Sequence, residues 1–345
     1  MINSLIKSHI HLWITLLTAT GCFVVSLSAE DSRTFSSVSE LWKDREVFLP
    51  EFFPEMETLS ADDIFIEGLK NRFPNRIHRE MPELEPGPAE SPRIETLMEG
   101  VNYVRVYDLG RALSALEDLV AASTLVVDLR HVQAGRDDTL ALGALLALNE
   151  TVELSLSESA AGNEANAEAQ HLPIQPAGLR RPLQPVFVLT NRETAGPVET
   201  LLAELKDKGQ IISIGTPTAG KTGSFRRVLE EPPLYVLSSE LRPSSGDSLL
   251  ETGFVPAVRM TVSPDQDRKA YEAMEEGKSI LALVGADGDN DEPPPEPGEL
   301  RELLDREESR EPDENSEPVD TILQRAYFIA TALKSMGKIA PPESN

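Results

Sequence analysis

Hydrophobic residues between positions 101 and 215 alternate between short apolar runs and longer stretches with helical spacing. Short runs of aliphatic and β-branched residues predict buried strands, and helical spacing predicts amphipathic helices. The predicted strands are Val101–Asp108, Leu125–Leu129, Pro185–Thr190 and Gln210–Gly215. The predicted helices are Arg111–Val120, Asp138–Leu148 and Pro197–Lys208. Strands that alternate with helices in this way indicate parallel pairing and an α/β fold.

The remaining patterns divide the rest of the chain. Asn149–Gly178 is polar and rich in alanine and glutamate, which predicts that it includes a long loop. Val319–Met336 regains helical spacing, which predicts an amphipathic helix that must dock on another apolar surface. After residue 224 the pattern changes to short predicted strands, which are Phe225–Glu230, Leu234–Leu241 and Val255–Val262.

The first 29 residues have the order of a secretory signal peptide. Lys7 is followed by an apolar stretch, Leu12–Leu27, and by small residues that end at Ala29. Cleavage there predicts a periplasmic or secreted protein with no integral membrane domain. A retained membrane anchor is an alternative, because the stretch approaches the shortest length that spans a bilayer. A further alternative is a lipoprotein anchored at Cys22, because Ala19–Cys22 resembles a weak bacterial lipobox.

Composition excludes several classes of function. The chain has 58 acidic and 32 basic residues and a formal charge of −26, so it would repel nucleic acid and anionic lipid. A single cysteine excludes an internal disulfide and a zinc site built on paired thiolates. No metal or cofactor is predicted.

Much of the negative charge lies in one segment near the C-terminus. Residues 285–320 hold 15 acidic residues against three arginines and are rich in proline, which predicts a disordered linker. Five segments follow from these patterns. They are a signal peptide (1–29), a Pro/Glu-rich and partly helical segment (30–95), an α/β domain (96–284), the acidic linker (285–318) and a C-terminal helix (319–337).

Gly215–Thr222 matches the P-loop pattern G-x-x-x-x-G-K-[ST] after an apolar strand. A phosphate cradle also needs a helix that begins at the Lys-Thr pair. Here Gly223 follows at once, and Pro232 would end any helix within a few turns. The candidate magnesium ligand, Asp128, lies upstream of the pattern. The sequence therefore argues against nucleotide binding.

Several motifs in order resemble the C-terminal-processing (tail-specific) serine peptidases. Val101–Arg130 is similar to the start of their catalytic domain, which ends an apolar strand in Asp-Leu-Arg. Val186–Gly220 looks like their nucleophile strand, helix and lysine strand, and Gly253–Pro256 resembles their closing Gly-Ile-x-Pro signature. The resemblance covers residues 100–262 and the last helix. It implies a Clp protease/crotonase-like ββα core for residues 96–284.

In that family a serine attacks the peptide carbonyl, and a desolvated lysine acts as general base. The family's nucleophile motif reads Ser-Ala-Ser-Ala-x-Glu, with the second serine as nucleophile. The equivalent run here is Thr194–Glu199, so the resemblance places Gly196 at the nucleophile position and Lys221 at the base position, 25 residues later. Glycine has no hydroxyl, so no acyl-enzyme can form at Gly196.

The resemblance also assigns the neighbouring positions. Glu199 and Asp207 are retained, whereas His131–Gly135 replaces the family's Asn-Asn-x-Gly-Gly oxyanion loop and Ala257 replaces an aspartate. The candidate substrate-binding residues are Ala134, Gly135 and Thr218.

These residues predict an exported, peptidase-like protein that is catalytically inactive and binds a polypeptide or protein partner. One alternative is an active serine-type hydrolase that uses Ser224 or Thr194 as a relocated nucleophile with Lys221 as base. His131 beside Asp128 suggests a serine–histidine–carboxylate variant of that alternative. Another is a non-catalytic assembly subunit whose C-terminal helix docks on a partner. Homo-oligomerisation remains open.

Overall fold

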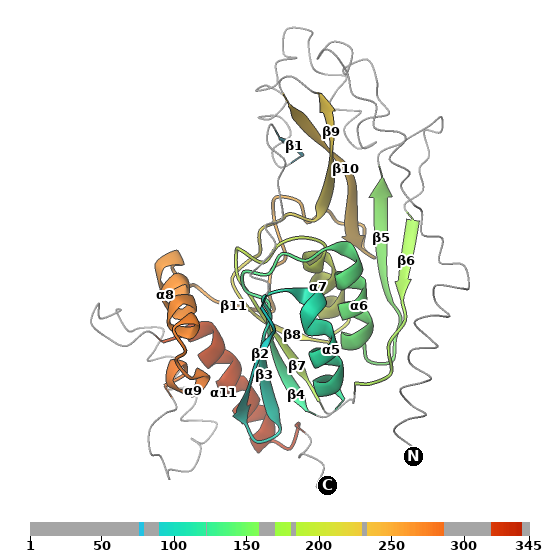
Figure 1. The fold of residues 1–345 in the computed structure, drawn as a ribbon. Helices are drawn as coiled ribbons and strands as arrows, with labels where there is room; N and C mark the ends of the chain where they lie inside the picture. The colour runs from blue at the N-terminus through green and yellow to red at the C-terminus, as the bar shows by residue number, and fades with distance from the viewer. Residues whose placement is uncertain are drawn as a thin grey trace.

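The computed structural model describes residues 76–78, 90–121, 123–158, 170–180, 184–229, 233–285 and 319–339 (Figure 1). The predicted signal peptide, Cys22, most of segment 30–95 and nearly all of the acidic linker lie outside these ranges. Within them, no helix has both the length and the apolar character needed to cross a membrane.

A six-stranded sheet forms the centre of the fold, with strand order β11-β8-β7-β4-β3-β2. All neighbouring strands pair in parallel except β2, which is antiparallel to β3. Its strands are β2 (Arg93–Met98), β3 (Val101–Arg105), β4 (Thr124–Asp128), β7 (Val186–Thr190), β8 (Ile212–Gly215) and β11 (Val258–Arg259). Both β4 and β7 are buried along their whole length, as continuous apolar runs in parallel sheets should be. The predicted α/β fold is therefore confirmed.

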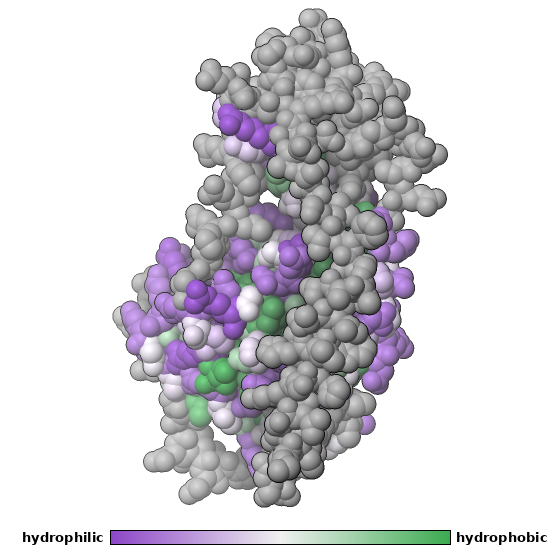
Figure 2. Space-filling view, turned by 45° about the vertical axis from the view of Figure 1, so that its right-hand side comes forward, coloured by the Kyte–Doolittle hydropathy of each residue, from purple (hydrophilic) through white to green (hydrophobic). Residues whose placement is uncertain are grey.

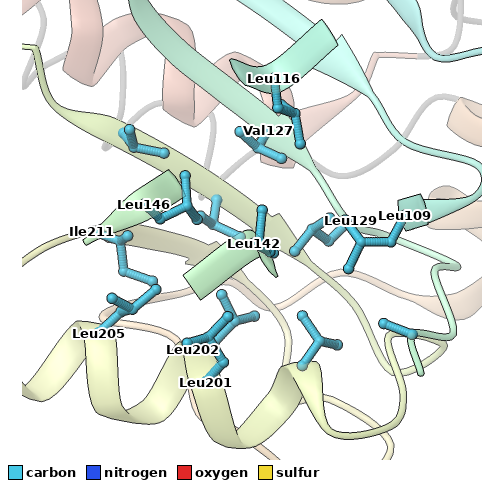
Figure 3. Close-up of a cluster of buried hydrophobic side chains, with 14 of the residues drawn as sticks. Leu109, Leu116, Val127, Leu129, Leu142, Leu146, Leu201, Leu202, Leu205 and Ile211 are labelled. Carbon is cyan, nitrogen blue, oxygen red and sulfur yellow. The ribbon is translucent and has the colours of Figure 1, made fainter. Parts of the chain in front are cut away.

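Helices cover both faces of this sheet (Figure 1). One face carries α5 (Leu109–Val120), α6 (Arg136–Leu146) and α7 (Val198–Asp207), and the other carries α8 (Pro264–Glu275), α9 (Ile280–Leu283) and α11 (Thr321–Ser335). Alternate strand residues supply the two cores: Val127 packs with the first set of helices and Val126 with the second. Figure 3 shows the first core, where leucines of all three helices meet β4.

A second, five-stranded antiparallel sheet extends away from the first (Figure 1). Its strands are β1 (Ile77–His78), β5 (Val152–Glu158), β6 (Gln170–Ile174), β9 (Gly223–Leu229) and β10 (Leu234–Pro243). The segment Asn149–Gly178, which was predicted to include a long loop, also contains β5 and β6, and residues 159–169 between these strands lie outside the described ranges. Val152, Leu154 and Leu156 are buried at a period of two, which is the strand signal within this otherwise polar segment.

Other boundaries differ from the prediction for local reasons. Only two residues of the expected strand Val255–Val262 form a strand, β11, and its exposed Val255 follows the turn at Gly253.

The sequence pattern also missed α8, which has little apolar character. Its start was nevertheless encoded by a capping box, in which the Ser263 hydroxyl accepts from the Gln266 N–H and the Gln266 side chain accepts from the Ser263 N–H.

The predicted C-terminal helix is present as α11 and docks on its own chain. Its buried residues Leu323, Ala326 and Ala330 pack against the central sheet, close to β7 and β8. Asp320 caps the helix by accepting from the Leu323 N–H at 3.0 Å. The apolar face that was expected to need a partner is therefore covered within this chain. This removes the main argument for an assembly subunit that docks through this helix.

The outer surface is mixed in character. Figure 2 shows hydrophilic residues over much of the described surface on one side, with small hydrophobic patches between them. Among the residues that the structure describes, the exposed large apolar side chains are those of Ile94, Val255, Val319 and Met336. Such scattered residues are ordinary on a folded protein.

Candidate functional site

Three loops meet at the carboxyl edge of the central sheet, where α/β folds bind their ligands. They are residues 129–135 after β4, 191–197 after β7 and 216–222 after β8. The first two are joined by the Ala195 N–H, which donates to the Val132 carbonyl at 2.9 Å, and by the Ala134 N–H, which donates to the Ala195 carbonyl at 3.1 Å. The Ala219 N–H ties the third loop to the Thr194 carbonyl at 3.0 Å. The motifs predicted to form one site are thus brought together.

Gly196 lies at the centre of this arrangement, directly before α7. Its φ of +98° is a conformation that side-chain-bearing residues rarely adopt. A Cβ added there would lie 2.4 Å from the carbonyl oxygen of Ala134. The nucleophile position therefore lacks a hydroxyl and also lacks room for any side chain in this backbone arrangement.

Glu199, in the first turn of α7, is fully buried and holds the loops together. Its carboxylate accepts from four donors in three places along the chain. They are the N–H groups of Gly196 (3.1 Å), Gly220 (2.7 Å) and Lys221 (2.8 Å) and the hydroxyl of Thr218. Burial raises the pKa of Glu199, and these hydrogen bonds, which favour the ionised form, oppose the rise. The retained glutamate is thus a structural hub.

Lys221, at the predicted base position, is exposed to solvent. A lysine that acts as a general base needs a desolvated environment, which this position does not provide. Glu199 binds the backbone N–H of Lys221, at 2.8 Å, and not its side-chain ammonium.

The other predicted site residues separate into two groups. Thr218 is buried at the hub, where its hydroxyl also accepts from the Phe254 N–H at 2.7 Å. Ala134 lies against Gly196, and the exposed Gly135 caps the N-terminus of α6. Asp207 does not join them. It is exposed at the far end of α7, a helix that rises about 15 Å over its length.

Neither relocated nucleophile is paired with the lysine. The Thr194 hydroxyl is buried, donates to the Leu129 carbonyl at 2.9 Å and accepts from the Asn191 N–H at 3.1 Å. Ser224 is exposed on β9. Both hydroxyls therefore lack an activating base among the residues that the structure describes.

The suggested pairing of His131 with Asp128 is wrong. The Asp128 carboxylate accepts from the Tyr103 hydroxyl at 2.7 Å, from Arg130 Nη2 at 2.7 Å and from Arg105 Nη1 at 3.1 Å. The pKa of Asp128 is lowered: burial would raise it, but the two arginines and these hydrogen bonds outweigh burial. His131 Nε2 instead lies 3.0 Å from the side-chain nitrogen of Asn191.

The P-loop pattern also lacks its structural context. Residues 216–222 lead from β8 directly into β9, so no helix N-terminus faces a phosphate there. Within the described ranges, no group of three His, Cys, Asp or Glu side chains is placed to hold a metal ion.

Sequence reasoning missed the polar residues that surround His131, which are Asn191, Asp267 and Tyr271. Asn191 directly follows β7, and its place at a strand end was the available signal. Asp267 and Tyr271 lie on α8, the helix that the pattern did not predict.

Comparison with solved structures gives distant likenesses. The photosystem II D1 C-terminal processing protease is 21% identical over 46% of this chain and 42% of its own length, with a TM-score of 0.38. A lipoprotein from Streptococcus agalactiae is 15% identical over 67% of this chain and 87% of its own, with a TM-score of 0.42. A protein from Parabacteroides merdae described as a peptidase is 14% identical over 76% of this chain and 100% of its own, with a TM-score of 0.47. No match was found among curated proteins.

The family comparison is more specific. Residues 101–256 match the sequence model of peptidase family S41. This range begins at β3 and contains all three loops of the site. The resemblance seen in the sequence is confirmed for this part of the chain: residues 101–256, a little under half of its length, are similar to peptidase family S41.

Proposed function

We propose that this chain is an exported, peptidase-like protein that does not hydrolyse peptides and instead binds unfolded polypeptide at the carboxyl edge of its central sheet. The observation that carries the proposal is Gly196, which has no hydroxyl and no space for one beside the Ala134 carbonyl. Export rests on the order of residues 1–29, with lipidation at Cys22 as the alternative.

Acyl transfer needs a nucleophile, a base that activates it and N–H groups that bind the developing oxyanion. The Gly196 N–H is bound to Glu199, the Ala134 N–H is bound to the Ala195 carbonyl, and Lys221 is in solvent. In this arrangement the nucleophile is therefore missing, the lysine is not positioned as a base, and the N–H groups are already hydrogen-bonded. The loops that would surround a substrate are still held in one place, which supports binding without chemistry.

The first prediction concerns an unfolded substrate, fluorescein-labelled reduced casein. We expect its fluorescence anisotropy to rise as the protein is added, while its fragment pattern on a gel stays unchanged over hours. Lys221→Ala should give the same unchanged pattern, because an exposed lysine that activates no hydroxyl contributes nothing to turnover.

Two outcomes would contradict the proposal. Cleavage that disappears in Lys221→Ala would show an active serine–lysine hydrolase with a relocated nucleophile. A flat anisotropy titration would remove the binding role and leave the fold without a ligand at this edge.

A further inference from the structure

His131 occupies an unusual position in the fold. It follows β4 with a φ of +64°, a left-handed conformation that is uncommon for a residue with a side chain. The side chain is 30% exposed and its ring packs on Tyr271 of α8, with ring centroids 4.4 Å apart. It therefore lies between the central sheet's edge and α8, beside the loop that follows β7.

The hydrogen bonds of Asn191 determine the protonation state of this ring. The Asn191 Oδ1 accepts from the N–H groups of His131 at 3.2 Å and Glu193 at 3.0 Å, which fixes the orientation of the amide. The Asn191 Nδ2 must then face the ring, and it donates to Asp267 Oδ2 at 2.7 Å and to His131 Nε2 at 3.0 Å. The imidazole is neutral in this arrangement, with its proton on Nδ1.

We propose that His131 is a pH-sensitive switch whose protonation releases the loop Asn191–Gly196 from the loop His131–Gly135. A protonated Nε2 is a donor, and it would face another donor, the Asn191 Nδ2, at 3.0 Å. The Asp267 carboxylate, 3.9 Å away, would attract the protonated ring by its charge but lies beyond hydrogen-bond distance of Nε2. Turning the Asn191 amide to relieve the conflict would break its bonds to the N–H groups of His131 and Glu193.

The loop that loses these bonds is the one that holds Gly196. Two backbone hydrogen bonds, from the Ala134 N–H and from the Ala195 N–H, join it to the loop after β4. If Asn191 no longer holds its loop in place, we expect these two bonds to weaken as well. Acid would thereby free the N–H groups of Ala134 and Ala195. The switch concerns the conformation of these loops and does not depend on the proposed polypeptide binding.

Charges from every neighbouring element act on the ring. Burial is the largest influence and lowers the pKa of His131; Arg105 on β3 and Arg130 after β4 lower it further. Asp267 on α8 and Asp128 at the end of β4 oppose this. Arg130 is itself bound by Asp320, which precedes α11, and Arg105 lies 3.6 Å from Glu275 on α8.

The sign of the effect on stability follows from the direction of this shift. A histidine whose pKa is lower in the folded state binds its proton more readily when unfolded. Its contribution to stability is complete above the ordinary histidine pKa of about 6.5 and is lost as pH falls below it. The switch therefore acts below this pH, where the folded protein takes up the proton.

The test is an NMR titration of the full chain. The chain has five histidines, so the His131 ring signal can be assigned by substitution. We expect the backbone amide signals of Glu193, Ala195 and Gly196 to shift with the same midpoint as the His131 ring. His131→Asn should abolish the transition in these amides, and asparagine tolerates the left-handed backbone. The control is His171→Asn, at an exposed position on β6, which should leave the transition unchanged.

A second variant keeps the proposal testable if His131→Asn folds poorly. Asp267→Asn removes a carboxylate that favours the protonated ring, so the shared midpoint should move to lower pH. Loop amides that do not titrate with the ring, or a midpoint that Asp267→Asn leaves in place, would overturn the switch.

Discussion

Glu199→Ala is expected to lower the free energy of unfolding by about 3–5 kcal/mol, a loss typical of removing a buried polar hub. The substitution leaves three backbone N–H groups and the Thr218 hydroxyl without their acceptor in the interior. Each buried donor without a partner costs about 1–3 kcal/mol, and entering water would offset part of the sum. The loss should appear as a lower midpoint of urea denaturation.

The matched control lies on the same helix. Asp207→Ala removes an acidic side chain that is exposed, so its effect should stay within about 0.5 kcal/mol. If both variants unfold at the midpoint of the unaltered protein, Glu199 does not hold the loops together and the description of the site is wrong.

Asp320→Ala should detach α11 and cost about 3 kcal/mol of stability, because it breaks a buried ion pair and removes a helix cap. Asp320 Oδ2 lies 2.6 Å from Arg130 Nη2, and both side chains are almost fully buried. Arg130 would keep Asp128 at 2.7 Å and Asp267 at 3.8 Å, which limits the loss. Hydrogen exchange in α11 should become faster than in α5, which lies on the opposite face.

An exposed ion pair on α11 supplies the comparison. Lys334 lies 3.2 Å from Glu99, whose side chain is 74% exposed, and such surface pairs contribute about 0–1 kcal/mol. Glu99→Ala should therefore leave the exchange of α11 nearly unchanged. Equal effects of the two substitutions would show that the buried network does not hold the helix.

The sequence pattern predicted the parts of the fold that local rules determine. The runs that became β4 and β7 are continuously apolar because both of their faces are buried. The missing hydroxyl at Gly196 was also readable, since it depends only on the register of a motif. The strand β5 was missed because its polar positions diluted the alternating pattern.

The chemistry of the site could not be predicted in the same way. Exposure of Lys221 depends on how the loop after β8 passes over α7, and the hydrogen bonds of Glu199 come from positions up to 22 residues away. The grouping of His131, Asn191 and Asp267 joins three elements that are far apart in sequence. Such contacts arise from tertiary packing, which residue spacing alone does not encode.

We predict that no hydroxyl at this site is an activated nucleophile. The most direct measurement is the intact mass of the protein after incubation with a serine-reactive fluorophosphonate, with an active serine hydrolase treated in parallel. We predict an unchanged mass for this protein and complete labelling of the hydrolase. A stoichiometric adduct, mapped to Thr194, Ser224 or another hydroxyl near the carboxyl edge of the central sheet, would show that the site holds an activated nucleophile.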